Sequence, residues 1–258
     1  MLPVIQIGPL ALPAPGLAII AGIWIGLTVS EHYARRFNVD PSHLYNLVFI
    51  ALIAGIIGAR LSYAVRFPAA FAASPLSLLS RDLNLLDPWG GIAVAGLAAL
   101  VYGQRKGLDF WSTMDALTPG LAVLAVAWGV ANLASGNAYG APTQLPWGIQ
   151  LWGAHRHPTQ IYQILLALLI LVVILPGTGF IRTKLSGSRF LIFVALSAGA
   201  RLFLESFRGD STLILGGIRL AQVLAWLVLA GSLWGLARLQ TQRANDQPEP
   251  DRGNAQVN

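Results

Sequence analysis

Four charged side chains lie inside long apolar stretches of the sequence or at their ends. Arg60 lies in the segment GARLSY, Asp115 opens an apolar stretch, and GARLFLESFRGD contains both Arg201 and Glu205. A charge near the centre of a bilayer costs about 2.5–3.5 kcal/mol, so such residues usually face the protein interior, where they pair or bind a ligand.

The spacing of these charges leaves a structural interpretation beside the functional one. Arg201 and Glu205 are four residues apart and would share one face of a helix, so they could form an ion pair that only lowers the cost of both charges. Arg60 could simply extend its guanidinium to the membrane surface. The functional alternative is that these groups line a site in the interior.

A second concentration of polar and aromatic residues follows in the segment NLASGNAYGAPTQLPWGIQLWGAHRHPTQIYQ. Its tryptophans and tyrosines also suit the aromatic belt at a membrane interface. Arg156 and His157 offer donors that suit a phosphate, although His157 before Pro158 could equally be a turn residue. His155 and His157 lack the helical spacing of metal ligands, so we expect no metal site.

The composition indicates that these residues are positioned by membrane-spanning helices. The 258 residues are 55% hydrophobic and 11% charged, with a mean hydropathy of +0.62. Soluble domains carry about 25% charged residues. The absence of cysteine excludes a disulfide framework and a cysteine nucleophile in the chain. The net charge of +6 is attributed to membrane orientation and anionic head groups, not to nucleic-acid binding.

Seven apolar stretches predict an all-α, polytopic membrane protein with about seven transmembrane helices. They cover residues 14–32, 46–65, 90–103, 115–134, 160–176, 188–206 and 218–238. The third is short and rich in glycine, so it could instead start in a re-entrant or cavity-lining segment. The N-terminus lacks the basic region of a signal peptide, so the first stretch is expected to be a retained span. We assign residues 1–238 to one transmembrane domain and expect 239–258 to be a polar, disordered cytoplasmic tail.

Basic residues between the stretches or at their ends predict the orientation, because they accumulate on the cytoplasmic side. With the N-terminus outside, the five opposite residues are Arg66, Arg81, Arg156, Arg208 and Arg219. The ten cytoplasmic ones are Arg35, Arg36, Arg105, Lys106, Arg182, Lys184, Arg189, Arg238, Arg243 and Arg252. An outside N-terminus and a cytoplasmic C-terminus are therefore expected.

Taken together, the segments resemble the prolipoprotein diacylglyceryl transferase family of bacterial inner membranes. The resemblance covers IGPLALPAPGL, IGARLSYAV, WGGIAVAGLAALVYGQRKG, NLASGNAYGAPTQLPWG, RHPTQIYQ, GARLFLESFRGD and LAQVL, in the order of the family. It implies an enzyme that transfers diacylglyceryl from phosphatidylglycerol to the lipobox cysteine thiol of a prolipoprotein and releases glycerol phosphate. The nucleophile would then belong to the substrate, and no cofactor is implied.

The resemblance also implies roles for matching residues. Arg201 would bind the head-group phosphate, and Glu205 would orient Arg201 or accept a proton. His157 is the third implied catalytic residue. The implied substrate-binding residues are Arg60, Tyr63, Asp115, Asn132, Gly136, Tyr139, Arg156, Gln160, Tyr162 and Arg208. Gly140, Pro142 and Gln222 match further motif positions. We expect Arg60, Asn132, His157, Arg201 and Glu205 to converge on one cavity open to the outer leaflet.

Five positions depart from the family pattern at places where chemistry is expected. Gly129 stands where the family usually has an arginine, Ala95 where it has a histidine, and Asn137 where it has a glutamate. Pro13 and Pro15 stand in place of a histidine and a tyrosine near the start of the first stretch. Three interpretations follow: a transferase that uses other cationic groups, a transferase for a different lipid or acceptor, or a silent relative that binds lipid or signal peptides. A small transporter is the rival from another class, but the sequence shows no internal repeat.

Overall fold

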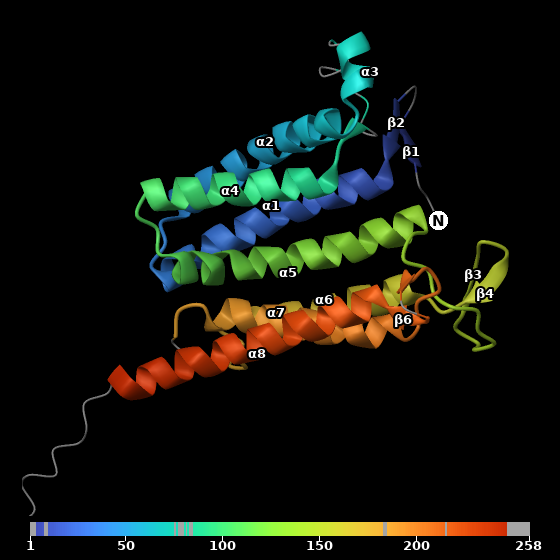
Figure 1. Cartoon of the computed structure of the whole chain (residues 1–258). Helices are drawn as coiled ribbons and strands as arrows, with labels where there is room; N and C mark the ends of the chain where they lie inside the picture. The colour runs from blue at the N-terminus through green and yellow to red at the C-terminus, as the bar shows by residue number, and fades with distance from the viewer. Residues whose placement is uncertain are drawn as a thin grey trace, which may run out of the picture. The chain divides into compact units, whose positions relative to one another are not determined.

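The computed structural model describes residues 4–7, 10–74, 76, 80, 82, 85–182, 185–214 and 216–246. Most of them are helical, and Figure 1 shows the elements in chain order. The helices are α1 (Ala14–Ala34), α2 (Pro41–Arg66), α3 (Pro68–Ala73), α4 (Pro88–Arg105), α5 (Phe110–Ser135), α6 (Thr159–Ile174), α7 (Ser188–Glu205) and α8 (Leu220–Asp246), with a 3-10 turn, η1 (Arg35–Phe37), after α1.

Each of the seven predicted apolar stretches coincides with a helix. Among the described residues, four helical segments are long and apolar enough to cross a membrane: Ala14–Phe37, Pro41–Arg66, Phe110–Ser135 and Leu220–Gln242. Helix α6 is apolar but has only 16 residues. The largely helical membrane protein is thereby confirmed, whereas seven crossings and the orientation stay predictions. Helix α8 continues to Asp246, beyond the boundary expected at 238, and Arg81, Lys184, Arg252 and residues 247–258 lie outside the described residues.

Large apolar side chains point outward along the long helices. Trp24 on α1, Ile56 on α2 and Leu97 on α4 are 73%, 64% and 63% exposed, and Leu227 on α8 is 65% exposed. Soluble proteins rarely expose apolar surfaces of this extent, because contact between apolar groups and water is unfavourable. The hydrocarbon of a membrane is therefore the solvent that fits these faces.

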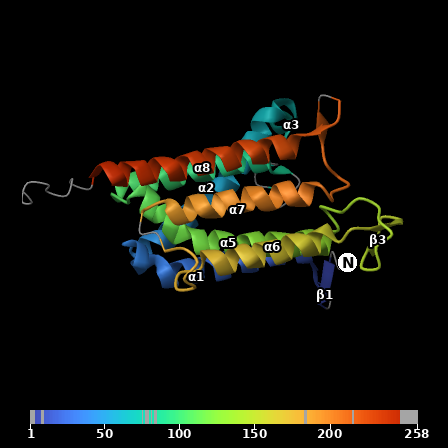
Figure 2. The same ribbon diagram turned by 90° about the horizontal axis from the view of Figure 1, so that it is seen from below.

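Three short antiparallel hairpins were not predicted. β1 (Val4–Ile7) pairs with β2 (Leu10–Pro13), β3 (Ile149–Leu151) with β4 (Ala154–Arg156), and β5 (Leu213–Ile214) with β6 (Ile218–Arg219). Figure 2 shows the β3–β4 hairpin beyond the ends of α5 and α6. Part of the polar and aromatic segment between α5 and α6 therefore forms a hairpin outside the helices.

Two helices begin with the same Asp-Pro signal. Asp40 precedes Pro41 at the start of α2, and Asp87 precedes Pro88 at the start of α4. The Asp40 carboxylate accepts bonds from the Ser42 amide and hydroxyl at 2.8 and 2.7 Å, which lower the pKa of Asp40. An aspartate cap followed by proline satisfies the free donors of the first turn and fixes where the helix begins.

The chain forms two compact units, Met1–Gly26 with Thr118–Asn258 as unit 1, and Leu27–Leu117 as unit 2. In unit 2, α2 packs along α4, as Figure 1 shows. Gly58 and Gly91 permit this approach: a Cβ at position 58 would lie 2.4 Å from Val94 Cβ, and one at position 91 would lie 2.9 Å from Ala59 Cβ. Small residues let helix backbones approach closely in a membrane.

Near the other end of unit 2, a small core surrounds the link between α1 and α2. Ala34, Val39, Leu44 and Ala116 are buried together, with Phe37 and Leu117 packed against them. Asn38 adopts a left-handed conformation (φ 59°) that ends η1. The tight link thus joins α1 to α2 without leaving the core open.

The α2–α4 contact leads to a test on two glycines. Gly58→Ala should destabilise the protein by about 1–3 kcal/mol, because its Cβ overlaps Val94. The matched change Gly96→Ala on α4 meets no atom within 4 Å and should be neutral or stabilising by up to about 1 kcal/mol, since alanine favours helix. Thermal unfolding of the purified protein in detergent measures both, and equal effects would contradict this packing.

Candidate functional site

Arg201 and Glu205 form an ion pair in the last turns of α7. Arg201 Nη2 lies 3.2 Å from Glu205 Oε2; the arginine side chain is 40% exposed and the glutamate is fully buried. The pair is not aligned as a hydrogen bond, and neither carboxylate oxygen of Glu205 has a hydrogen-bond partner among the described residues. The spacing prediction of a shared helical face is therefore correct, and the glutamate keeps unused acceptor capacity.

Arg201 lies in the wall of an apolar cavity of about 560 Å³ within unit 1. Ala125 on α5, Val194 and Ser197 on α7, and Leu224 on α8 are among its lining residues. A guanidinium beside an apolar cavity can bind a ligand that joins an anionic head to hydrocarbon. An ion pair sealed in a dry helix contact would not have this exposed side.

A second ion pair follows one turn beyond Glu205. Arg208 Nε and Nη2 both bind Asp210, each at 2.8 Å, in a bidentate arrangement. The charges of Arg208 and Asp210 also act on Arg201. Since the Arg208 fork is engaged by Asp210, Arg201 is the more available of the two guanidiniums.

The loop before α6 packs against the end of α7 through backbone hydrogen bonds. Ala141 N donates to Phe207 O at 2.7 Å, His157 N donates to Ala141 O at 3.0 Å, and Gly209 N donates to Tyr139 O at 3.0 Å. A Cβ at Gly140 would lie 2.3 Å from His157 O, so only glycine fits this crossing. The motif residues and the α7 terminus are thereby held in one backbone network.

Arg156 is used within this network. Its Nε donates to Leu151 O at 3.0 Å, its Nη1 donates to Gly140 O at 3.3 Å, and its guanidinium lies 4.9 Å from the centre of the Tyr139 ring. The prediction that Arg156 and Tyr139 contact substrate is not tested by these contacts. They show that both residues stabilise the loop.

His157 and Gln160 leave buried polar atoms unpaired among the described residues. His157 Nδ1 and Gln160 Oε1 are buried without a partner, while Gln160 Nε2 donates to Asn137 O at 2.9 Å. The His157 ring packs edge-on against Phe207, 5.3 Å between centroids, and lies 6.4 Å from Tyr162. Buried polar atoms usually have partners, so these two mark places where a ligand or water could bind.

Asn132 lies at the end of α5, where its Nδ2 donates to Gln163 Oε1 at 3.1 Å. Its carbonyl accepts a bond from Gly136 N, and the Gly136 carbonyl in turn accepts one from the Trp152 indole at 3.0 Å. Trp152 has φ 52°, unusual for a large side chain. The sequence interpretation of this tryptophan as a membrane-belt residue missed its role in the turn between β3 and β4.

Three predicted substrate-binding residues belong to unit 2. Arg60 donates to the carbonyls of Asp82 and Leu85, at 3.1 Å each, and to that of Ser80. Tyr63 packs against the rings of Phe67 and Phe71. Asp115 is buried, 4% exposed, beside the small core of this unit. Arg60 therefore binds the chain between α3 and α4, which the alternative of a guanidinium extended to the membrane surface did not foresee.

Two of the positions at which the resemblance implies a different residue in the family lie at close helix contacts. A Cβ at Gly129 on α5 would lie 2.8 Å from Ile164 Cγ1 on α6, so helix packing leaves no room for a larger side chain at this position. Ala95 faces Gly55, where a Cβ would lie 3.1 Å from Ala95 Cβ. Asn137 contributes its backbone carbonyl to Gln160. Small side chains at positions 95 and 129 thus serve packing.

Comparison with known proteins gives one consistent result. The family model described as prolipoprotein diacylglyceryl transferase matches residues 3–238. The phosphatidylglycerol–prolipoprotein diacylglyceryl transferase of Nostoc sp. is 32% identical over 265 residues, covering 96% of this chain and 91% of the relative. Those of Thermosynechococcus vestitus and Clostridioides difficile are 31% and 28% identical, covering 96% and 91% of this chain and 94% and 93% of the relatives.

The Gly129–Ile164 contact can be tested by a double-mutant cycle. Gly129→Ala should destabilise the protein by about 1–3 kcal/mol, and by at least about 0.5 kcal/mol less in an Ile164→Ala background that removes Cγ1. Gly199→Ala on α7, with no atom within 4 Å, is the matched control. Additive effects in thermal unfolding would show that position 129 is not closed by Ile164.

Proposed function

The chain belongs to the prolipoprotein diacylglyceryl transferase family, and from this premise we propose that it transfers diacylglyceryl from phosphatidylglycerol to the lipobox cysteine of a prolipoprotein. The observation that carries the proposal is Arg201 in the wall of an apolar cavity, with the buried Glu205 behind it. The chain covers 91–94% of the length of the three relatives named above.

Phosphatidylglycerol combines a phosphodiester with two acyl chains, and the cavity offers a surface for each part. The Arg201 guanidinium would donate to the phosphate oxygens, and the apolar walls from α5, α7 and α8 would receive hydrocarbon. Removing a phosphate from water is costly unless charged donors replace its hydration. Arg201 can donate to the phosphate because its side chain is partly exposed, whereas Arg208 would first have to leave its bidentate pair with Asp210.

The reaction requires that the cysteine sulfur bond to the terminal glyceryl carbon of the diacylglyceryl group while the bond from that carbon to the phosphate oxygen breaks. The oxygen and its electron pair leave with glycerol phosphate, and the thiol proton must go to a base. The thiolate is the nucleophile, so the base acts before or during attack. Glu205, with free acceptor capacity beside Arg201, is our candidate for that base or for a residue that orients the arginine.

We assign a positioning role to the loop before α6. Arg156, Gly140 and Tyr139 fix its backbone, and the unpaired buried atoms of His157 and Gln160 would receive polar groups of the head group or of the lipobox peptide. Asn132 would brace this loop through Gln163 and Gly136. The convergence of Arg60 with these residues stays a prediction, as do substrate contacts of Tyr63 and Asp115.

We further propose that residues 1–238 form a multi-pass domain of the bacterial inner membrane, with the N-terminus outside. The proposal is supported by the apolar helices and by the distribution of basic residues. The signal peptide of the prolipoprotein would then meet the Arg201 side of α7 at the outer leaflet. Residues 239–258 would face the cytoplasm.

A catalytically silent relative that binds lipid or signal peptides is the second candidate. It is favoured by one observation: the positions of the family's histidine and arginine are occupied by Ala95 and Gly129, at close helix contacts. Binding without chemistry would need the cavity and Arg201 but not a proton acceptor.

The first test is transfer by purified protein in phosphatidylglycerol nanodiscs to a lipobox peptide, followed by mass spectrometry of the thioether product. Arg201→Ala should lower kcat/KM by about 10²–10³, the loss typical when a donor to developing negative charge is removed. Arg182→Ala, an exposed arginine between α6 and α7, should keep the wild-type rate. No product from folded wild-type protein that still binds the lipid would reject the transferase in favour of the silent relative.

The second test separates the two roles of Glu205. If it accepts the thiol proton, the isosteric Glu205→Gln should lower kcat by about 10²–10⁴ and remove one ionisation from the pH profile of kcat/KM. If it only orients Arg201, the amide oxygen can still accept a bond, so kcat should change little and KM should rise. Binding of phosphatidylglycerol measured beside the rates checks that the site remains formed.

A further inference from the structure

Unit 2 contains a cavity that the proposed reaction does not use. It has a volume of about 360 Å³ and lies among α2, α4 and the start of α5. Leu47, Ala99, Leu100, Leu108 and Met114 supply most of its apolar lining. Its volume is in the range of pockets that bind small ligands.

The α4 helix has two faces of different design. Gly91 and Ala95 face α2 at close range, whereas Gly96 and Gly103 line the cavity, and a Cβ at either position would meet no atom within 4 Å. Glycine inside a helix costs about 0.5–1 kcal/mol relative to alanine. No helix packs closely against Gly96 or Gly103, so helix packing does not explain why glycine occupies these positions. The open space beside them is the feature to be explained.

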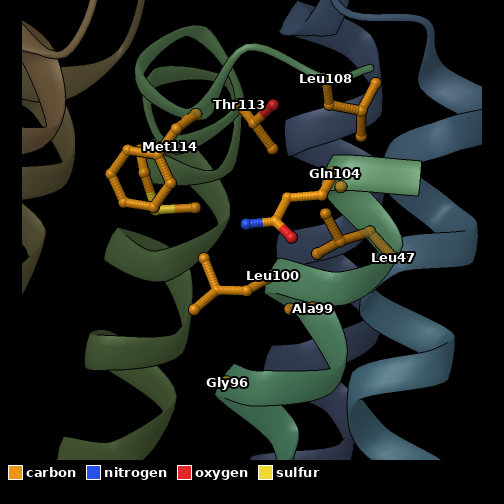
Figure 3. A pocket seen from close by; sticks show the side chains of 10 residues that line it. Leu47, Gly96, Ala99, Leu100, Gln104, Leu108, Thr113 and Met114 are labelled. Carbon is orange, nitrogen blue, oxygen red and sulfur yellow. The ribbon is translucent and has the colours of Figure 1, made fainter. Parts of the chain in front are cut away.

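One end of the cavity is polar. Figure 3 shows the Gln104 side chain extending from α4 into the cavity, and its amide has no hydrogen-bond partner among the described residues. Arg105 and Lys106 follow directly in the chain, before the lining residue Leu108, and neither forms an ion pair within the described part. Asp109 is the nearby acid, and its carboxylate accepts a bond from Ser112 N at 2.8 Å.

We propose that this cavity binds one acyl chain of an anionic phospholipid, with the head group at Gln104, Arg105 and Lys106. From Gly96 to Gln104 the helix rises about 12 Å, which is room for a segment of extended hydrocarbon beside α4. The two basic residues attract an anionic head group, and Gln104 can donate to its oxygens. The site lies in unit 2 and does not depend on the transfer proposed for Arg201.

The two basic residues between the lining residues Gln104 and Leu108 favour a lipid over the other possible occupants. A second copy of this chain would bring its own basic segment, since the net charge is +6. A signal peptide carries a positively charged start, which Arg105 and Lys106 would repel. An anionic lipid instead supplies both the hydrocarbon and the opposite charge.

Photoaffinity labelling in nanodiscs tests the proposal. Two probes, a phosphatidylserine and a phosphatidylcholine with the same diazirine-bearing acyl chain, are compared at equal mole fraction, and labelled peptides are mapped by mass spectrometry. We expect labelling within residues 96–114, about fivefold stronger for the phosphatidylserine probe. Arg105→Gln with Lys106→Gln should remove most of this preference.

A cavity-filling variant provides the structural control. Gly96→Leu with Gly103→Leu should reduce the labelling at least fivefold without unfolding, whereas Gly199→Leu with Gly231→Leu, at equally open glycines of α7 and α8, should not change it. Arg201→Ala should label like wild type, which separates this site from the transfer reaction. Equal labelling by the two probes, or labelling insensitive to cavity filling, would overturn the proposal as general solvation by lipid. No labelling of residues 96–114 by either probe would also overturn it.

Discussion

Helices in a bilayer gain little by burying apolar side chains against one another, because lipid tails are equally apolar. Close packing of helix backbones is one of the interactions that stabilise them instead, and this chain achieves it with glycine. A Cβ at Gly26 of α1 would lie only 2.7 Å from the Gly120 carbonyl oxygen of α5. A Cβ at Gly58 of α2 would likewise overlap Val94 of α4. The same device recurs in the loop, where Gly140 crosses His157. The positions of the charged side chains depend on these contacts.

The candidate site combines a rigid frame with a few incompletely satisfied groups. Arg156 and Arg208 are held by carbonyls, an aromatic ring or a bidentate carboxylate, so their charges support the loop and the end of α7. Arg201, Glu205 and His157 keep exposure or unpaired atoms. Catalytic groups require both conditions, because the frame must hold them in place while their polar atoms stay available to the substrate.

Hydropathy was sufficient to predict where the helices lie, since about 20 apolar residues suffice for a span whatever their identity. The Arg201–Glu205 pair was also predictable, because helical spacing decides which side chains meet. The hairpins were not, since strands of two to four residues have no periodicity to detect. Nor could the sequence separate Arg60, bound to carbonyls, from Arg201, which faces a cavity, because both are arginines at the ends of apolar stretches.

The contact between Gly129 and Ile164 has an evolutionary consequence. An arginine at position 129, which the resemblance implies for the family, would overlap Ile164 unless the isoleucine were also replaced by a smaller residue. Gly129→Arg alone would create a clash, and a smaller residue at position 164 alone would leave a void. Selection for an added cationic group would therefore act on other positions before position 129, because this position needs two changes together.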